Sequence, residues 1–176
     1  YHPDMKDYVE GNYSADNQLG DEAEARKGES RLWKYYEGIR KASTFIVNVD
    51  RCPELTMDEI ADMKGQARFL RAYCYWALIR VYGPVPLIPL EGLDVNLSYE
   101  ELSLPREHFD NLVDFIDQEL AESARSLPTK RTVNNLGRPT RGAALGLRSR
   151  VLLYAASPLF NGNTDFFNVK DCYGNQ

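Results

Sequence analysis

The chain has 176 residues, of which 43% are hydrophobic and 27% are charged, and its net charge at pH 7 is −5. A chain of this length buries about 70% of its unfolded surface, which is enough for a domain with a hydrophobic core. The negative net charge argues against a nucleic-acid-binding surface, and the sequence has no run of about 18 apolar residues that would predict a membrane-spanning helix.

Residues 1–29 are polar, contain glycine and show no periodicity, so we expect a loop or a partly ordered segment. The first helix is expected over 31–49. Its apolar residues recur at intervals of four and three, which places them on one face: Tyr35, Ile39, Ala42, Ile46 and Val49. Pro53 ends this helix, because the residue before a proline is disfavoured in the helical conformation.

The second helix is expected over 56–82, and Thr56 and Glu59 form a capping box at its start. One apolar stripe is expected to comprise Ile60, Met63, Ala67, Leu70, Cys74, Ala77 and Val81. Beside it lies a second stripe of Phe69, Tyr73 and Trp76. Apolar residues over so much of the circumference predict a central helix that packs on more than one side. We therefore expect Leu70, Tyr73, Trp76 and also Trp33 to belong to the core.

The third helix is expected over 106–126 and the fourth over 139–157. The inward residues of the third are Phe109, Val113, Ile116, Leu120 and Leu127. Its acidic residues predict a solvated face: Glu107, Asp110, Asp114, Asp117, Glu119 and Glu122. The fourth helix contains Gly142, Ala143, Ala144 and Gly146, small residues that are tolerated where a neighbouring helix approaches the backbone.

The four helices form two pairs of equal extent, 31–82 and 106–157, joined by an extended connection that begins at Pro84. We predict an all-α fold of stacked helical hairpins, tetratricopeptide-like, with long polar loops. The offset of 75 residues between the pairs exceeds the 34 residues of a standard repeat. Stacking usually needs about three repeats, so we expect the open end to pack against more protein.

The sequence offers little for catalysis. The two histidines, His2 and His108, have no metal-ligand spacing, and there is no phosphate-binding loop. Asp114 could stand close to Asp110 or Asp117, but a solvated face cannot raise the pKa of one carboxyl for glycoside hydrolysis. We therefore expect no enzyme activity, no metal and no cofactor.

The chain has three cysteines, Cys52, Cys74 and Cys172, and no two of them have the spacing of a CxxC motif. Cys74 is most simply a small buried hydrophobic residue. A Cys52–Cys172 disulfide is compatible with an exported protein, but sequence alone does not decide its geometry.

Binding is better supported than catalysis, because the chain has 11 tyrosines, 7 phenylalanines and 2 tryptophans. Aromatic planes pack against the C–H faces of sugars, while a few placed polar groups bind the hydroxyls. Such aromatics must lie outside the helices to be available. The best placed are Tyr8 and Tyr13, with Asn12, Asp16 and Asn17 nearby.

Two long segments carry a family resemblance. Residues 64–88 read KGQARFLRAYCYWALIRVYGPVPLI, and residues 137–162 read GRPTRGAALGLRSRVLLYAASPLFNG. In order and spacing they are similar to blocks of the SusD/RagB family of outer-membrane nutrient-binding lipoproteins. The resemblance covers residues 30–162.

The resemblance implies a helical scaffold over 30–157, with residues 158–176 as the start of a further segment. It also implies capture of glycan or a similar nutrient at the extracellular face of the outer membrane, and handover to a SusC-like TonB-dependent transporter. The lipid anchor would then lie upstream of Tyr1. In the family the loop before the first helix contributes to the glycan site, although this chain has no tryptophan there. The alternative is a helical repeat scaffold for protein–protein interaction without a ligand of its own.

Overall fold

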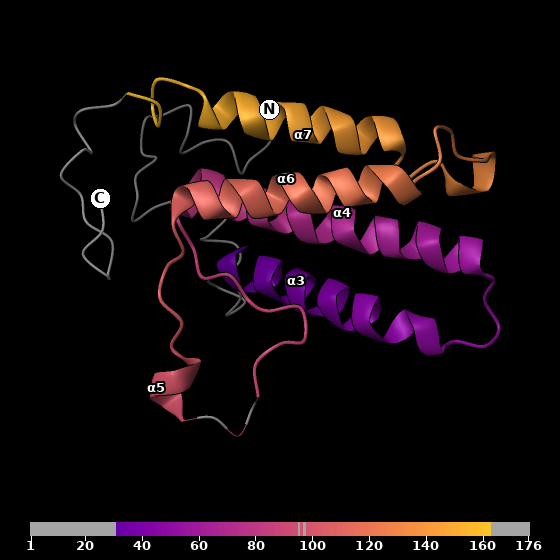
Figure 1. The fold of residues 1–176 in the computed structure, drawn as a ribbon, viewed down its shortest axis with the longest axis horizontal. Coiled ribbons are helices and arrows are strands. Elements are labelled where there is room, and N and C mark those ends of the chain that lie inside the picture. The colour runs from indigo at the N-terminus through magenta and orange to yellow at the C-terminus, as the bar shows by residue number, and fades with distance from the viewer. Residues whose placement is uncertain (1–30, 95, 97, 163–176) are drawn as a thin grey trace, which may run out of the picture. The chain divides into compact units, whose positions relative to one another are not determined.

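A computed structural model describes residues 31–94, 96 and 98–162 (Figure 1). The chain divides into two compact units, Tyr1–Glu37 and Gly38–Gln176. The described part of the first unit is the beginning of helix α3, and everything that follows concerns the second unit unless stated.

The described residues are helical and contain no strand, so the all-α prediction is confirmed. The long helices are α3 (Arg31–Asn48), α4 (Met57–Tyr82), α6 (Phe109–Ser126) and α7 (Arg141–Ala155). Three short elements accompany them: the 3-10 turns η2 (Val49–Arg51) and η3 (Val133–Asn135), and the single-turn helix α5 (Tyr99–Leu102). The ends of the long helices differ from the predicted ends by three residues or fewer.

Helix α4 begins and ends as its sequence predicts. The Glu59 amide donates to Thr56 Oγ1 at 3.3 Å, and the Thr56 amide donates to Glu59 Oε2 at 2.9 Å, which completes the capping box. Gly83 ends the helix with φ at 66°, a conformation that favours glycine, and its amide donates to the Ile79 carbonyl. Two prolines then keep the chain extended.

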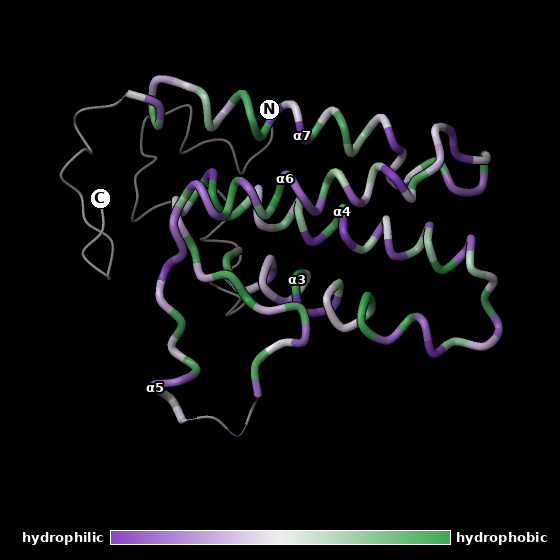
Figure 2. Tube along the Cα trace, in the orientation of Figure 1, coloured by the Kyte–Doolittle hydropathy of each residue, from purple (hydrophilic) through white to green (hydrophobic). Residues whose placement is uncertain are grey.

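Helix α6 lies between α4 and α7 and packs against both (Figure 1). Each helix alternates between hydrophobic and hydrophilic residues, as expected for amphipathic helices (Figure 2). The largest fully buried side chains come from α3, α4, α6 and α7: Ile39, Tyr75, Leu78, Ile79, Leu112, Ile116, Leu120 and Val151. The predicted inward residues Ile116 and Leu120 are thus confirmed.

Residues between α4 and α6 form a long excursion that carries α5 (Figure 1). Its two ends are tied together at the bundle. The Arg106 guanidinium donates to the carbonyls of Tyr82 and Pro84, each at 3.1 Å, and the Glu107 amide donates to the Val85 carbonyl at 3.2 Å. The excursion therefore leaves and re-enters the scaffold at one point.

The prediction for the apolar stripe of α4 was partly wrong. Leu70 is 52% exposed, and Val81 and Tyr73 are also exposed, whereas Trp76 is buried as expected. Ala72, Tyr75 and Leu78 are fully buried instead. The buried face of α4 is therefore rotated around the helix axis relative to the predicted stripe that contains Leu70.

Three further expectations were wrong. Trp33, in the first unit, is 69% exposed rather than part of the core. Glu119 is buried rather than solvated. In α7, a Cβ on Gly146 would meet no atom within 4 Å, so it marks no close helix approach; Ala144 is the residue that packs inward.

Candidate functional site

The predicted glycan contacts Tyr8, Asn12, Tyr13, Asp16 and Asn17 lie outside the described residues. The same holds for two other residues considered above, His2 and Cys172. Cys52 carries a free thiol. The described residues form the helical scaffold that follows the predicted loop in the sequence.

A buried polar centre connects α4 to the extended segment that follows it. Arg71 Nη2 donates to the Ile88 carbonyl at 3.0 Å, and the Ile88 amide donates to the Tyr75 hydroxyl at 2.9 Å. The Arg71 guanidinium also stacks over the Phe115 ring, 4.8 Å from its centre, and Tyr75 meets the same ring edge-on. Two side chains one helical turn apart thus bind both backbone groups of Ile88 and hold the start of the excursion against α4.

Glu119 supplies the negative charge of this centre. Arg68 Nη1 lies 2.5 Å from Glu119 Oε1, and Arg71 Nη1 lies 3.8 Å from Oε2. Burial raises the pKa of Glu119, while the two guanidinium groups oppose that shift. Loss of Glu119 would leave the buried Arg71 guanidinium without its carboxylate, and the cluster therefore links α4 to α6 through paired charges.

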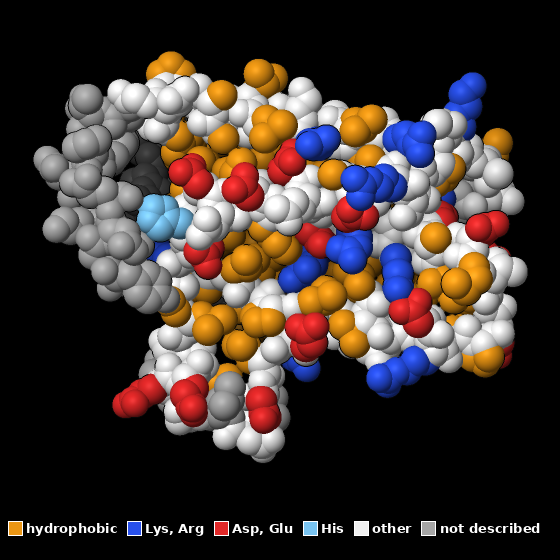
Figure 3. All heavy atoms as spheres, viewed as in Figure 1, with side chains coloured by type: hydrophobic (Ala, Val, Ile, Leu, Met, Phe, Trp, Pro, Cys, Tyr) orange, Lys and Arg blue, Asp and Glu red, His pale blue; other side chains and the backbone are white. Residues whose placement is uncertain are grey.

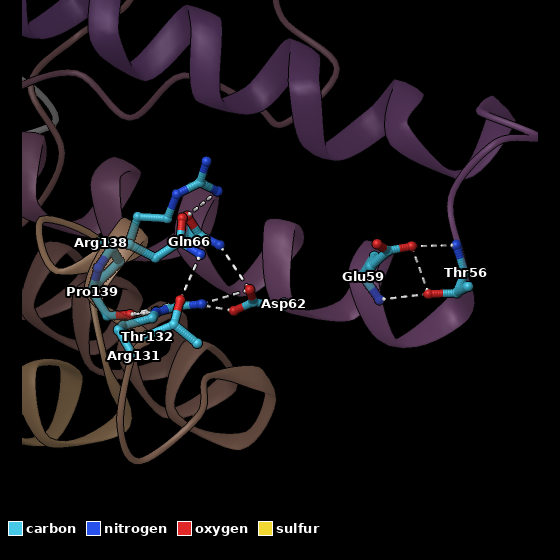
Figure 4. A network of polar contacts seen from close by, with 9 residues as sticks. Thr56, Glu59, Asp62, Gln66, Arg131, Thr132, Arg138 and Pro139 are labelled. Atoms are coloured by element: carbon cyan, nitrogen blue, oxygen red, sulfur yellow. Dashed lines mark hydrogen bonds and ion pairs between the residues drawn. The ribbon is translucent and has the colours of Figure 1, made fainter.

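A second polar network lies near the start of α4 and connects it to the loop between α6 and α7 (Figure 4). Arg131 binds both oxygens of Asp62, at 2.6 and 2.8 Å, and also donates to the Pro139 carbonyl at 2.7 Å. Gln66 donates to Asp62 at 2.9 Å and accepts from Arg138 at 3.4 Å. Through Gln66 these bonds connect Arg138 to α4.

The three carboxylates considered for hydrolysis differ in their surroundings. Asp117 forms a two-pronged ion pair with Arg148 of α7, at 2.5 and 2.9 Å, whereas Asp110 and Asp114 are exposed. His108 occupies the N-cap position of α6. Among the residues that the structure describes, no group of His, Cys, Asp or Glu could hold a metal ion. No described helix is long and apolar enough to cross a membrane.

An aromatic cluster joins the end of α7 to the start of α6. Phe160 stacks on Phe109 with ring centres 4.0 Å apart, and Tyr154 contacts both Phe160 and Trp76 at 5.0 Å. These rings pack against one another and stabilise the scaffold. The cluster uses residues from the second of the two family-like segments.

A groove of about 520 Å³ lies along α3 and α4. Helix α3 contributes Gly38, Lys41, Ala42 and Phe45, helix α4 contributes Met63, Gln66, Ala67, Leu70 and Cys74, and Arg138 reaches over from the α6–α7 loop. Burial raises the pKa of the Cys74 thiol to about 11. Leu70, predicted to be core, lines this groove. Its spacing is that of a buried stripe, so the sequence pattern alone could not distinguish a groove from a core.

Comparisons with known proteins agree with this fold. Residues 6–153 match the model of the SusD-like family described as "Starch-binding associating with outer membrane". A SusD-like protein of Formosa agariphila is 24% identical over 143 residues, which cover 80% of this chain and 26% of that protein.

Solved structures give the same result. The crystal structure of a SusD-like protein from Bacteroides fragilis is 30% identical, with a TM-score of 0.64, over 74% of this chain and 24% of that one. A laminarin-binding SusD-like protein has a TM-score of 0.62 at 23% identity, over 81% of this chain and 31% of that one.

The helical hairpins and the family match place the chain in a class of helical, tetratricopeptide-like proteins. The chain belongs to the SusD-like family. It spans about a quarter of the length of the curated relative and of the first solved structure that it matches.

Proposed function

We propose that the protein captures an oligosaccharide or a similar nutrient outside the outer membrane, without cleaving it, and passes it to a SusC-like TonB-dependent transporter. The observation that carries this proposal is the family match over residues 6–153, whose description joins starch binding to the outer membrane. The structural likeness to a laminarin-binding protein supports a glycan ligand.

The described helices act in this proposal as a rigid support. The Arg71–Tyr75–Ile88 contacts and the Arg131–Asp62 pair hold the connections in fixed positions. The proposed contacts to the glycan are Tyr8, Asn12, Tyr13, Asp16 and Asn17. Ring stacking on one aromatic contributes about 0.5 to 1.5 kcal/mol beyond buried area, so several contacts must act together.

The handover is tested by purification of the tagged, membrane-anchored protein from outer membranes. We expect a large TonB-dependent barrel protein to co-purify. Glycan capture is tested by retention of the full-length protein in gels that contain single polysaccharides, with a Tyr8→Ala, Tyr13→Ala variant alongside. Retention of both proteins to the same extent would refute the loop assignment. Release of reducing sugar from any of these polysaccharides would refute capture without cleavage.

A further inference from the structure

The excursion between α4 and α6 is fastened to the helical bundle at its base. Its outer part, residues 89–104, carries α5 and is called the strap below (Figure 1). On the side of α4, Arg71 and Tyr75 bind the carbonyl and the amide of Ile88, the residue that precedes the strap. On the side of α6, Arg106 donates to two carbonyls near the end of α4. The strap therefore begins and ends next to fixed points of the bundle.

The hydrogen bonds described in the strap join strap residues to one another. The Gly92 amide donates to the Pro89 carbonyl at 3.1 Å, and the Leu102 amide donates to the Ser98 carbonyl at 3.0 Å. Ser98 and Glu101 form a capping box at the start of α5, with the Ser98 amide 2.9 Å from Glu101 Oε2. Among the strap residues that the structure describes, all but 95 and 97, none forms a hydrogen bond or an ion pair with the bundle.

Little apolar surface of the strap is removed from water. None of its described side chains is buried, and its four leucines are partly buried: Leu90, Leu93, Leu102 and Leu104. Val85, at the base of the excursion, is by contrast only 3% exposed. A segment with few buried apolar contacts and exposed hydrogen bonds opens at a lower free energy than the core of the same protein.

Ile88 is held much more firmly than the strap that follows it. Both of its backbone groups are bound by buried side chains, since Arg71 is 3% exposed and Tyr75 is fully buried. Arg71 also contacts Glu119 and Phe115 of α6, so the attachment of Ile88 involves both helices. Breaking these bonds would leave buried polar groups without partners, which is costly. The restraint on the chain therefore falls sharply between Ile88 and Pro89.

We propose that the strap opens away from the helical bundle without unfolding it, and that Arg71 and Tyr75 form a latch that stops this opening at Ile88. When the latch is broken, the opening extends back to Val85, whose carbonyl accepts a hydrogen bond from the Glu107 amide. This motion is a property of the scaffold and does not depend on glycan capture.

Native-state hydrogen exchange of the full-length protein tests the opening amide by amide. Relative to their intrinsic rates, the amides of Gly92 and Leu102 should exchange at least about tenfold faster than the amide of Ile88. The amide of Glu107, at the other side of the base, should be protected like that of Ile88.

Conservative variants test the latch. Tyr75→Phe keeps the ring against Phe115 and removes the acceptor of the Ile88 amide, so exchange of Ile88 should accelerate about tenfold, or about 1.4 kcal/mol. Arg71→Lys, which keeps a cation beside Glu119, should act in the same direction. In both variants the amides of α6 should exchange as in the parent. Tyr73→Phe is the matched control, because Tyr73 is 45% exposed on the same helix, and it should leave Ile88 unchanged.

Distances between spin labels test the motion itself. In a background with all three cysteines replaced by alanine, one label pair is placed on the strap and on α6 (Glu100→Cys, Asp114→Cys). The control pair lies on two bundle helices (Asp58→Cys, Asp114→Cys); all three positions are exposed. Pulsed electron resonance should give a broader distance distribution for the strap pair than for the control pair, and Tyr75→Phe should broaden the strap distribution further.

Several results would overturn the proposal. Strap amides that are protected as strongly as Ile88 would show that the strap does not open locally. Ile88 exchange at the parent rate in Tyr75→Phe, or the same rate in Tyr75→Phe and Tyr73→Phe, would remove the latch. Acceleration of the α6 amides to the same extent as Ile88 would mean that Tyr75 stabilises the whole bundle and is not a latch. Equally narrow distance distributions for the two label pairs would exclude the motion.

Discussion

Leu70 lines the groove and is half exposed, so its truncation should cost less stability than truncation of a leucine in the core. A pair of Leu→Ala substitutions, one at each kind of position, measures this difference in the free energy of unfolding. Leu120 of α6 is fully buried, whereas Leu70 of α4 is 52% exposed. Leu→Ala removes the equivalent of about three methylene groups at about 0.8 kcal/mol each. At Leu120 the cavity left behind adds to this, so we expect a loss of about 2 to 5 kcal/mol.

At Leu70 about half of the side chain already meets water and no closed cavity forms, so the expected loss is about 1 kcal/mol. Urea unfolding of the full-length protein, followed by circular dichroism at 222 nm, measures both values. Ile116→Ala, also at a fully buried position, serves as a second core reference and should resemble Leu120→Ala. If Leu70→Ala costs as much as Leu120→Ala, Leu70 is a core residue and the groove assignment is wrong.

Three further predictions follow from the capping box and the groove cysteine. Thr56→Ala removes the cap of α4 and should reduce the free energy of unfolding by about 1 kcal/mol; an unchanged urea midpoint would contradict it. Hydrogen bonds from Thr56 lower the pKa of Glu59, so the stabilisation by Glu59 is present above the ordinary glutamate pKa and is lost as pH falls through the lowered value. The loss of stability in Glu59→Ala should therefore shrink as the pH falls below the ordinary pKa of glutamate, and a constant loss would refute the pairing. Burial raises the pKa of Cys74 to about 11. In a Cys52→Ser, Cys172→Ser background, the rate of Cys74 alkylation should therefore keep rising with pH until the pH reaches this pKa. A rate that levels off near the pKa of an ordinary thiol would show that the Cys74 thiol is not desolvated.

Local signals in the sequence were sufficient to locate the helices. The capping box of Thr56 and Glu59, Gly83 before Pro84, and Pro53 after α3 are each read from neighbouring residues. These signals depend on backbone groups within one turn of the helix end, so they do not require knowledge of the tertiary structure.

The buried charges could not be predicted in this way. Arg68 and Glu119 are 51 positions apart, and a charged residue on an amphipathic helix is normally assigned to water. Arg71 is buried because Ile88, Phe115 and Glu119 surround it, and no local pattern reports that convergence. The acidic face predicted for α6 is therefore partly internal: Asp117 and Glu119 bind arginines of the neighbouring helices.

The faces of α4 were ambiguous for a related reason. Because α4 is apolar on several sides, spacing alone allows more than one inward stripe. The structure turns Tyr75 and Leu78 toward the core and leaves Leu70 beside the groove. On the face shown in Figure 3, hydrophobic side chains lie at the surface between the acidic and basic ones over α4 and α6.

The central claim, that the protein binds glycan without cleaving it, is tested most directly by isothermal titration calorimetry. The full-length protein is titrated with a panel of oligosaccharides that includes laminarin and starch fragments, and product analysis accompanies each titration. Saturable heats with at least one glycan, weakened in the Tyr8→Ala, Tyr13→Ala variant and without shortened products, are the predicted result. No binding to any member of the panel would contradict the account.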